Sequence, residues 1–162
     1  MSLNLVGLGH FHPENEITNA FLESLDIGTT DEWILDRVGI RSRRTALPLD
    51  YIRETRNRDP REAIAAAEYS QAQMGARAAE LAIERAGIDA SQIGLVIGGG
   101  CAPDTVSPAD ACNLACELGI ESPAFDVASA CTSFYAGVQV LSMMSPEKLP
   151  DYVLLTSMEG MT

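Results

Sequence analysis

The sequence predicts an α/β fold built on a largely parallel sheet. Short apolar runs alternate with helix-like stretches, as expected when each strand is followed by a helical crossover to a parallel neighbour. Ile93 to Ile97 is continuously apolar, which is typical of a strand buried on both faces. The connection from Met144 to Pro150 is short, as is usual between a helix and the next strand. With 162 residues, 46% of them apolar, the chain is expected to form one domain with a substantial core.

The individual elements follow from periodicity and from residues that begin and end helices. Thr18 is a candidate N-cap for one helix, and either Thr30 or Asp31 caps the next, which Gly39 ends. The polar stretch 41–61 is ambiguous because two prolines interrupt it. The predicted strands are 3–9, 93–97, 125–127 and 152–156, and the predicted helices are 18–25, 32–38, 63–86, 108–118 and 132–144.

Cys131 is the strongest candidate for a chemical role. It stands where the strand 125–127 gives way to the helix 132–144. A thiol at a helix start faces unpaired N–H groups and the positive end of the helix dipole, and both favour the reactive thiolate. The same N–H groups can stabilise an oxyanion when an acyl carbonyl is attacked. The segment therefore suits acyl transfer, although on position alone Cys131 is equally a small buried hydrophobic residue.

The other cysteines and the histidines suggest no metal site. Cys112 and Cys116 share one face of a helix, but no second pair of ligands has the spacing of a zinc site, so burial is expected. Free thiols, including Cys101, are the default in a chain that looks cytoplasmic, with no signal peptide and no membrane-spanning run. His10 and His12 are expected to be surface or turn residues.

The basic residues are concentrated in one segment of an acidic chain. The net charge is −12, yet the segment 37–61 holds eight arginines against three acidic residues and carries +5. An acidic chain argues against nucleic-acid binding, whereas a local arginine cluster suits a phosphate-bearing ligand or an acidic partner. A solvated or internally paired face is an equally good interpretation. The arginines are Arg37, Arg41, Arg43, Arg44, Arg53, Arg56, Arg58 and Arg61.

Glycines 98–100 follow the strand 93–97 and would let a ligand or another part of the chain approach the backbone closely. As a phosphate-binding loop the motif is weak, because no Gly-Lys-Ser/Thr follows. Gly7-Leu-Gly9 is not a dinucleotide fingerprint either, since position 12 is histidine and Pro13 interrupts any helix there.

Three motifs together resemble a known family. They are Thr29-Thr-Asp-Glu-Trp-Ile34, Arg37-Val-Gly-Ile-Arg41 and Phe125-Asp-Val-Ala-Ser-Ala-Cys131. In this order they are similar to the N-terminal half of β-ketoacyl-acyl-carrier-protein synthase III, a condensing enzyme of the thiolase fold. The resemblance runs over nearly the whole chain. It implies one N-terminal thiolase-like domain over 1–162, with a mixed, largely parallel sheet, helices on both faces, and the family's C-terminal half absent.

The resemblance also implies a function. Family members form an acyl-cysteine from acyl-coenzyme A and condense it with malonyl-acyl carrier protein in fatty acid biosynthesis. Cys131 matches the nucleophile, Trp33 the tryptophan that stacks on the coenzyme A adenine, and Thr29 and Arg37 positions that line the same entrance. No cofactor or metal is implied beyond the substrates. The implied partners are acyl-coenzyme A, acyl carrier protein and, in the full-length form, a second copy of the chain.

Departures from the family leave alternatives open. The family's catalytic His and Asn lie in the half that this chain lacks, so the chain alone is not expected to complete condensation. The segment 49–69 is longer than usual, and Ser107 stands where many members have a bulky aromatic, which suggests room for a longer acyl chain. One alternative is a related thiolase-fold enzyme of head-to-head acyl condensation, hydroxymethylglutaryl-type synthesis or polyketide priming. Another is a non-catalytic, half-length subunit of a heteromeric synthase.

Overall fold

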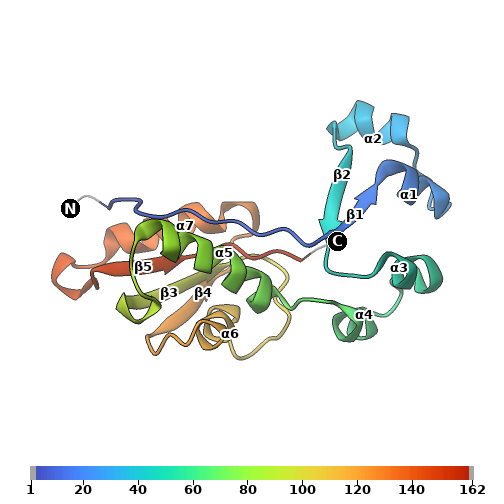
Figure 1. Ribbon diagram of the computed structural model, residues 1–162. Coiled ribbons are helices and arrows are strands. Elements are labelled where there is room, and N and C mark those ends of the chain that lie inside the picture. The colour runs from blue at the N-terminus through green and yellow to red at the C-terminus, as the bar shows by residue number, and fades with distance from the viewer. Residues whose placement is uncertain (1–2, 161–162) are drawn as a thin grey trace. The chain divides into compact units, whose positions relative to one another are not determined.

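A computed structural model describes residues 3–160, which form two compact units (Figure 1). Unit 1 comprises residues 3–11 and 71–160, and unit 2 comprises residues 12–70. Each unit has its own hydrophobic core. The assignment of 1–162 to a single thiolase-like domain stays a prediction.

Unit 1 is an α/β layer on a three-stranded parallel sheet, as the alternation of elements predicts. The strand order is β4-β3-β5, so β3 is hydrogen-bonded on both edges. Its elements are α5 (Gln71–Ala86), η1 (Ala90–Gln92), β3 (Ile93–Gly99), α6 (Asp110–Glu117), β4 (Ala124–Val127), η2 (Ala130–Thr132), α7 (Ser133–Met143), η3 (Pro146–Lys148) and β5 (Tyr152–Leu155).

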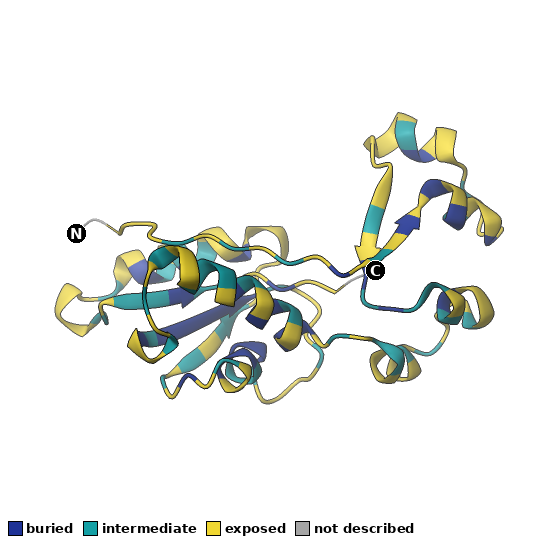
Figure 2. Ribbon diagram, in the orientation of Figure 1, coloured by how far each residue is buried: buried dark blue, intermediate teal, exposed yellow. Residues whose placement is uncertain are grey.

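Helices cover both faces of this sheet. Val96 of β3 packs in one cluster with residues of α5 and α6, whereas Leu95 and Ile97 pack with Leu141 of α7 on the opposite face. Val96 and Ile97 are 0% exposed, and β3 is the most continuously buried strand in Figure 2. The predicted burial of this strand on both faces is therefore confirmed, and so is the predicted architecture of a parallel sheet between helices.

A bulge in β3 places Ile93 on the same face as Val96, although the two are three positions apart in a strand. The register with β5 shifts between Ile93 and Leu95. A bulge adds one residue and so exchanges the faces of the residues before it. Gly94 lies at the bulge, and a side chain there would overlap Pro150. The glycine thus allows both the bulge and the close approach of the chain that leads into β5.

Unit 2 combines a two-stranded antiparallel sheet with short helices. Asn15 pairs with Thr45 and Thr18 with Ser42. Its elements are β1 (Asn15–Thr18), α1 (Asn19–Ser24), α2 (Asp31–Val38), β2 (Ser42–Thr45), α3 (Leu49–Thr55) and α4 (Pro60–Ala66). Its core consists of Ile17, Phe21, Leu25, Leu47 and Ile52.

The predicted caps of unit 2 are confirmed. The Thr18 hydroxyl accepts from Phe21 N at 3.1 Å at the start of α1. Thr30, rather than Asp31, is the N-cap of α2, and its hydroxyl accepts from Trp33 N at 3.2 Å. Gly39 ends α2 with φ 69°, the left-handed conformation that glycine adopts without strain.

The predicted strand 3–9 is wrong. This segment is extended but pairs with no strand among the described residues, and it runs along α5 (Figure 1). Side chains at Gly7 and Gly9 would overlap the carbonyls of Ala82 and Ala78 in α5. Arg85 Nη1 also donates to Leu8 O at 2.6 Å. The two glycines therefore let this backbone lie directly on a helix.

The single helix predicted over 63–86 is two helices, α4 and α5. The chain becomes extended at Ala67, with ψ 136°. The following residue is bound elsewhere in unit 2, because Glu68 N donates to Ala46 O at 2.8 Å and Glu68 Oε2 accepts from Asn15 Nδ2 at 2.9 Å. These tertiary hydrogen bonds outweigh the helix-forming run of alanines. In the part of the chain that the structure describes, no helix has both the length and the apolar character needed to cross a bilayer.

Candidate active site

The loops that follow all three strands of unit 1 meet beyond the carboxyl ends of these strands. This end of the sheet is called the sheet edge below. The carbonyls at the end of β3 hold the loops after the other strands: Ile97 O accepts from Thr156 N at 2.9 Å and Gly99 O from Met158 N at 2.9 Å. Gly100 O accepts from Ala130 N at 3.4 Å. The carboxyl ends of parallel strands are where α/β folds place their ligand sites. This edge is therefore the candidate site of unit 1.

The glycines 98–100 make this convergence possible. A side chain on Gly98 would overlap the Asp126 carboxylate, and one on Gly99 would lie 2.6 Å from Cβ of Ser133. A Cβ on Gly100 would lie 2.6 Å from the carbonyl oxygen of Met158. The sequence predicted close approach at these glycines. The approaching groups in this structure belong to the chain itself.

Cys131 lies at this edge and is exposed. It sits in η2 (Ala130–Thr132), the tight turn between β4 and α7. Ala130, which precedes it, has φ 47°, a left-handed conformation that is strained for a residue with a side chain. Such strained turns recur where a nucleophile is raised above the end of a strand. The interpretation of Cys131 as a buried hydrophobic residue is thus wrong.

Ser133 fastens the turn that carries Cys131. It is 2% exposed, and its hydroxyl accepts from Ser129 N at 2.9 Å. The same hydroxyl donates to Gly100 O at 3.4 Å. The side chain thus ties both ends of the turn to the end of β3. A glycine at this position could not form these hydrogen bonds.

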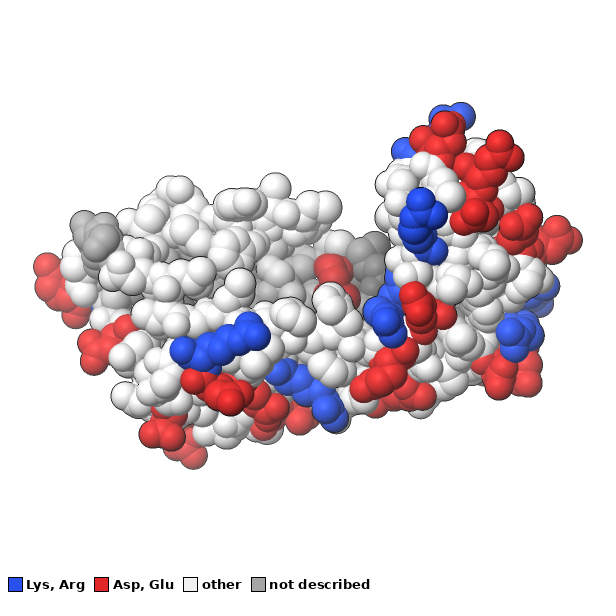
Figure 3. All heavy atoms as spheres, turned by 45° about the horizontal axis from the view of Figure 1, so that its top comes forward, with Lys and Arg blue, Asp and Glu red and all other residues white. Residues whose placement is uncertain are grey.

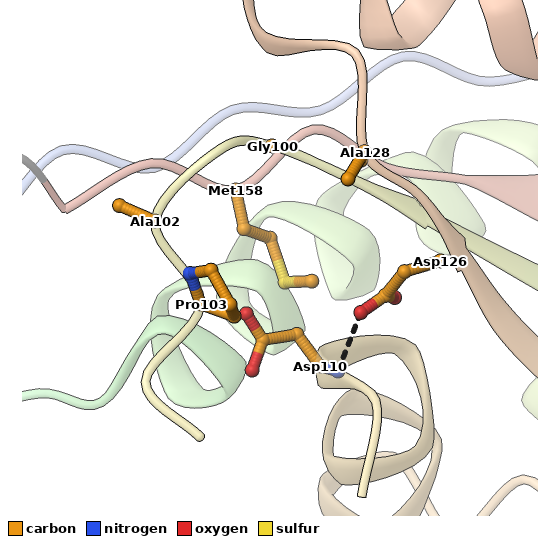
Figure 4. Close-up of a pocket in the computed structure, with 8 residues that line it drawn as sticks. Gly100, Ala102, Pro103, Asp110, Asp126, Ala128 and Met158 are labelled. Atoms are coloured by element: carbon orange, nitrogen blue, oxygen red, sulfur yellow. Dashed lines mark hydrogen bonds between the residues drawn. The ribbon is translucent and has the colours of Figure 1, made fainter. Parts of the chain in front are cut away.

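Two aspartates lie beneath the edge, in a small pocket of about 40 Å³ (Figure 4). Asp126 of β4 accepts from Asp110 N at 2.8 Å through one carboxylate oxygen and from Ala111 N at 2.9 Å through the other. It therefore caps the N-terminus of α6 from a neighbouring strand. Asp126 belongs to the same sequence motif as Cys131, and the structure gives it this anchoring role.

Asp110 carries the clearest electrostatic perturbation of the region. Burial raises the pKa of its carboxyl from 3.8 to about 6, and the negative charges of Asp104 and Asp126 add to the shift. Asp104 in turn accepts from Gln71 N at 2.7 Å, at the start of α5. Asp104 and Asp126 thus accept hydrogen bonds from the N-termini of α5 and α6. Because their negative charges lie close to Asp110, they disfavour its ionised form and raise its pKa.

Sequence reasoning missed two further groups at this edge, Cys101 and Glu159. Cys101 is exposed in the loop after β3, and its N–H and thiol both donate to Glu159, which follows β5. The distance from Cys101 Sγ to Glu159 Oε2 is 3.6 Å. Both residues come shortly after predicted parallel strands, whose carboxyl ends share an edge. That rule, applied to the predicted strands, would have placed them near Cys131.

The other three predicted site residues lie in unit 2. Trp33 and Arg37 are one turn apart on α2; the indole residue is 55% exposed, and the Arg37 guanidinium lies 5.8 Å from the ring centroid. Thr29 precedes the helix, and its hydroxyl oxygen is buried with no hydrogen-bond partner within the described residues. The structure thus brings Thr29, Trp33 and Arg37 into one segment of unit 2, and places Cys131 in unit 1.

Asn19 holds α2 in place within unit 2. It is buried, and its Nδ2 donates to Asp31 Oδ1 and to Ile40 O, both at 2.8 Å. Its Oδ1 accepts from Arg43 Nη1 at 2.9 Å. These bonds link both ends of α2 to α1 and β2. These hydrogen bonds therefore fix the position of α2 within unit 2.

Several arginines of the basic segment are engaged within unit 2. Arg43 contacts Asn19, and Arg44 Nη1 donates to Glu14 O at 2.8 Å. Arg53 forms an ion pair with Asp50 at 2.8 Å, and Arg61 lies 3.8 Å from Asp59. On the face drawn in Figure 3, basic and acidic side chains are intermingled. The internally paired interpretation accounts for these four arginines.

The remaining cysteines and the histidines show no cluster of metal ligands within residues 3–160. Cys112 is half-buried and its thiol donates to Ala124 O at 3.5 Å. Cys116 is exposed, so its predicted burial is wrong. The apolar residues that α6 buries are Ala111, Leu114 and Ala115, and Cys116 does not belong to this buried face. His10 and His12 are exposed, as predicted.

Comparison with known proteins finds homologues of a single kind. No protein-family model matches it. It is 35% identical over 156 residues to β-ketoacyl-acyl-carrier-protein synthase III of Citrobacter koseri, an alignment that spans 96% of this chain and 43% of that protein. Its relative from Salmonella paratyphi A is 40% identical over 135 residues. The chain thus spans less than half the length of the curated relatives that it matches.

Solved structures agree with the sequence relatives. The priming β-ketosynthase of the R1128 polyketide pathway superposes with a TM-score of 0.78 and 28% identity, over 98% of this chain and 42% of that one. The 3-oxoacyl-acyl-carrier-protein synthase III of Aquifex aeolicus gives a TM-score of 0.75 and 27% identity, over 94% and 43%. The chain therefore has the thiolase-type fold of these enzymes and is a homologue of β-ketoacyl-acyl-carrier-protein synthase III, matched over nearly all of its own length and over less than half of theirs.

Proposed function

We propose that this chain is the nucleophile-bearing half of a 3-oxoacyl-acyl-carrier-protein synthase III-type acyltransferase of fatty acid biosynthesis. The observation that carries the proposal is the exposed Cys131, raised on a left-handed turn where β4 passes into α7. The homology supports the same assignment. A packing cysteine would need neither the exposure nor the strained turn.

The proposed first step is transfer of an acyl group from coenzyme A to Cys131. The Cys131 thiolate attacks the thioester carbonyl, and the negative charge moves to the carbonyl oxygen. N–H groups at the start of α7 are suited to stabilise that charge. The intermediate then expels the coenzyme A thiolate, leaving the acyl group as a thioester on Cys131. The step needs no cofactor besides the acyl donor.

The proposed coenzyme A grip is the exposed face of α2. A flat indole beside a guanidinium offers stacking for an adenine and a cation for a phosphate. Trp33 and Arg37 have this arrangement, with 5.8 Å between guanidinium and ring centroid. The roles of Thr29, Trp33 and Arg37 are carried over from the family resemblance.

The proposed second step is condensation with malonyl-acyl carrier protein, which needs groups beyond this chain. The family resemblance puts a His and an Asn that promote decarboxylation in the half of the enzyme that has no counterpart here. We therefore propose that the chain accepts an acyl group but does not condense it. Acyl carrier protein and a second copy of the chain are the proposed partners of the full-length form, with the cytoplasm as its compartment.

The test is acylation of the purified chain by acetyl-coenzyme A, read by intact mass and peptide mapping. We expect one acetyl group on Cys131, no adduct on Cys131→Ser, and an unchanged adduct on Cys116→Ser, which removes another exposed thiol. An acetyl group on a different cysteine would refute the assignment of the nucleophile. Complete absence of an adduct on a folded chain would favour the non-catalytic subunit.

A second candidate, polyketide priming, is favoured by the similarity to the R1128 priming β-ketosynthase. Both candidates use the same acyl-cysteine, so the identity of the acyl donor distinguishes them.

Ser107 is a small residue in the exposed loop between β3 and α6, where the family often has a bulky aromatic. We propose that the site accepts longer acyl groups. Comparing acetyl- with octanoyl-coenzyme A tests this, and strict preference for acetyl would contradict it.

A further inference from the structure

The edge of the sheet in unit 1 carries a second exposed thiol that the proposed acyl transfer does not use. Cys101 follows Gly100 in the loop after β3, whereas Cys131 follows Ala130 in the turn after β4. The two cysteines are far apart in sequence and belong to loops that converge on the same strand ends. Their proximity is therefore a product of the fold.

A backbone hydrogen bond joins the residues that immediately precede the two cysteines. Ala130 N donates to Gly100 O at 3.4 Å, so Cys101 and Cys131 leave a common contact point. The Ser133 hydroxyl, which also donates to Gly100 O, fixes the same point from the start of α7. A disulfide requires two Cα atoms within about 7 Å of each other, and adjacent hydrogen-bonded segments supply such pairs.

The charge of Cys131 also acts on the Cys101 thiol. The pKa of the Cys101 thiol is raised, first by its hydrogen bond with Glu159, then by slight desolvation and the charge of Glu159, and further by the charge of Cys131. Cys101 is thus kept as a protonated thiol beside the proposed nucleophile. This is the protonation state in which it leaves the neighbouring thiolate undisturbed during acyl transfer.

Glu159 gives Cys101 a proton acceptor. Its carboxylate accepts from the Cys101 N–H through Oε1 and from the thiol through Oε2, at 3.6 Å for the latter. The approach depends on Gly100, where a Cβ would lie 2.9 Å from Oε1. A thiol hydrogen-bonded to a carboxylate can lose its proton as its sulfur attacks an electrophile.

We propose that Cys101 is a resolving thiol for Cys131, and that a hydroperoxide converts the pair into a reversible Cys101–Cys131 disulfide. The proposal rests on the proposed role of Cys131 as the reactive thiolate. In the first step the Cys131 sulfur takes one oxygen from the hydroperoxide, giving a sulfenic acid and, from hydrogen peroxide, water. In the second step the Cys101 sulfur attacks that sulfur and the S–O bond breaks; Glu159 takes the thiol proton and passes it to the departing hydroxide, which leaves as a second water.

The consequence for the site is protection rather than damage. A sulfenic acid without a nearby thiol is oxidised further to sulfinic acid, which thiols do not reduce. A disulfide stops at a state that dithiothreitol reverses. Oxidation therefore switches the proposed nucleophile off and reduction restores it, without loss of the cysteine.

The experiment treats the purified chain with hydrogen peroxide and maps the cysteines by mass spectrometry. Cleavage before aspartate places Cys101, the Cys112 and Cys116 pair, and Cys131 on three different peptides, which trypsin cannot do. We expect a cross-link between the Cys101 and Cys131 peptides, with loss of two hydrogens and complete reversal by dithiothreitol. Cys116→Ser is the matched control and should form the same cross-link.

The variant Cys101→Ser should instead show Cys131 trapped by dimedone as sulfenic acid, or oxidised to sulfinic acid that dithiothreitol does not reverse. The proposal is overturned if wild-type Cys131 over-oxidises while Cys101 can still be alkylated, or if the cross-link joins other cysteines. Acylation by acetyl-coenzyme A is measured on the same samples. Acylation without the cross-link refutes the resolving thiol alone, and the cross-link without acylation refutes the acyltransferase alone.

Discussion

The sheet edge of unit 1 and helix α2 of unit 2 present their candidate residues in opposite ways. At the sheet edge, Cys131 sits on a strained turn held by the buried Ser133 and by the carbonyl of Gly100. On α2, Trp33 and Arg37 lie on an ordinary capped helix, with the guanidinium 5.8 Å from the centre of the indole ring. A chemical step needs a fixed geometry, whereas reversible binding of a nucleotide needs an accessible surface. The two regions match these two demands.

The largest expected effect is on the packing of the sheet edge. In Gly99→Ala the new Cβ would lie 2.6 Å from Cβ of Ser133, so either β3 or α7 must shift. We expect a loss of about 1–3 kcal/mol in the free energy of unfolding, measured by urea denaturation. Gly160→Ala is the control, because its Cβ would meet its nearest neighbours at an ordinary 3.5 Å. Equal stability of both variants would mean that the edge is loosely packed and the comparison above is mistaken.

The next effect sharpens the comparison from the side of α2. Trp33→Ala should weaken coenzyme A binding about tenfold, since stacking of a base on an aromatic ring is worth about 1–3 kcal/mol. Stability should change little, because the residue is 55% exposed. Isothermal titration of coenzyme A measures the dissociation constant, with Trp33→Phe expected to retain most of the affinity. Val38→Ala, another exposed residue of α2, should bind as wild type; an equal loss there would remove Trp33 from the proposed grip.

A pH-dependent effect separates the carboxylates beneath the edge from the rest of the chain. Because the pKa of Asp110 is raised from 3.8 to about 6, the folded state holds its proton more tightly than the unfolded state. The contribution of Asp110 to stability is therefore full below its unfolded pKa and is lost as pH rises through about 6. We expect Asp110→Asn to raise the melting temperature at neutral pH and to leave it nearly unchanged at about pH 4. Scanning calorimetry across this range gives the answer, and a stabilisation independent of pH would contradict the charge argument.

The smallest expected effect concerns the support of α2. Thr30→Ala removes the hydroxyl that accepts from Trp33 N, and loss of such an N-cap costs about 1 kcal/mol. Thr30→Ser retains the acceptor and serves as the control. Denaturant unfolding followed by the fluorescence of Trp33 reports on unit 2 directly, since this is the one tryptophan of the chain. An unchanged midpoint in Thr30→Ala would show that Asn19 alone suffices to hold the helix.

Features of the fold that depend on residues close together in the sequence were predicted correctly. The cap at Thr18, the left-handed end at Gly39 and the doubly buried β3 were all readable from neighbouring residues. The break between α4 and α5 was not, because it depends on hydrogen bonds from Glu68 to residues far away in sequence. The strand predicted at 3–9 was wrong for the same reason, because this segment packs against the distant helix α5 and not against another strand.

The candidate site divides along the same line. Cys131 was found because a small-residue turn between a strand and a helix is a local pattern. Cys101 and Glu159 were missed because nothing beside them in sequence marks them. They become neighbours only once β3, β4 and β5 lie parallel and end at one edge. The left-handed Ala130 was also unforeseen, because alanine is not a residue type that usually adopts this conformation.

The central position of β3 has a consequence for the exchange of amide hydrogens with solvent. Both edges of this strand are hydrogen-bonded, and Val96 and Ile97 are fully buried, so their amides can exchange only when the whole sheet opens. The loops at the carboxyl end of β3 are hydrogen-bonded to the residues that follow these two. Deuterium uptake should therefore rise from the amides of β3, which exchange last, to rapid exchange in the loop that follows, for example at the fully exposed Val106. This rise would mark the boundary between the rigid strand and the loop.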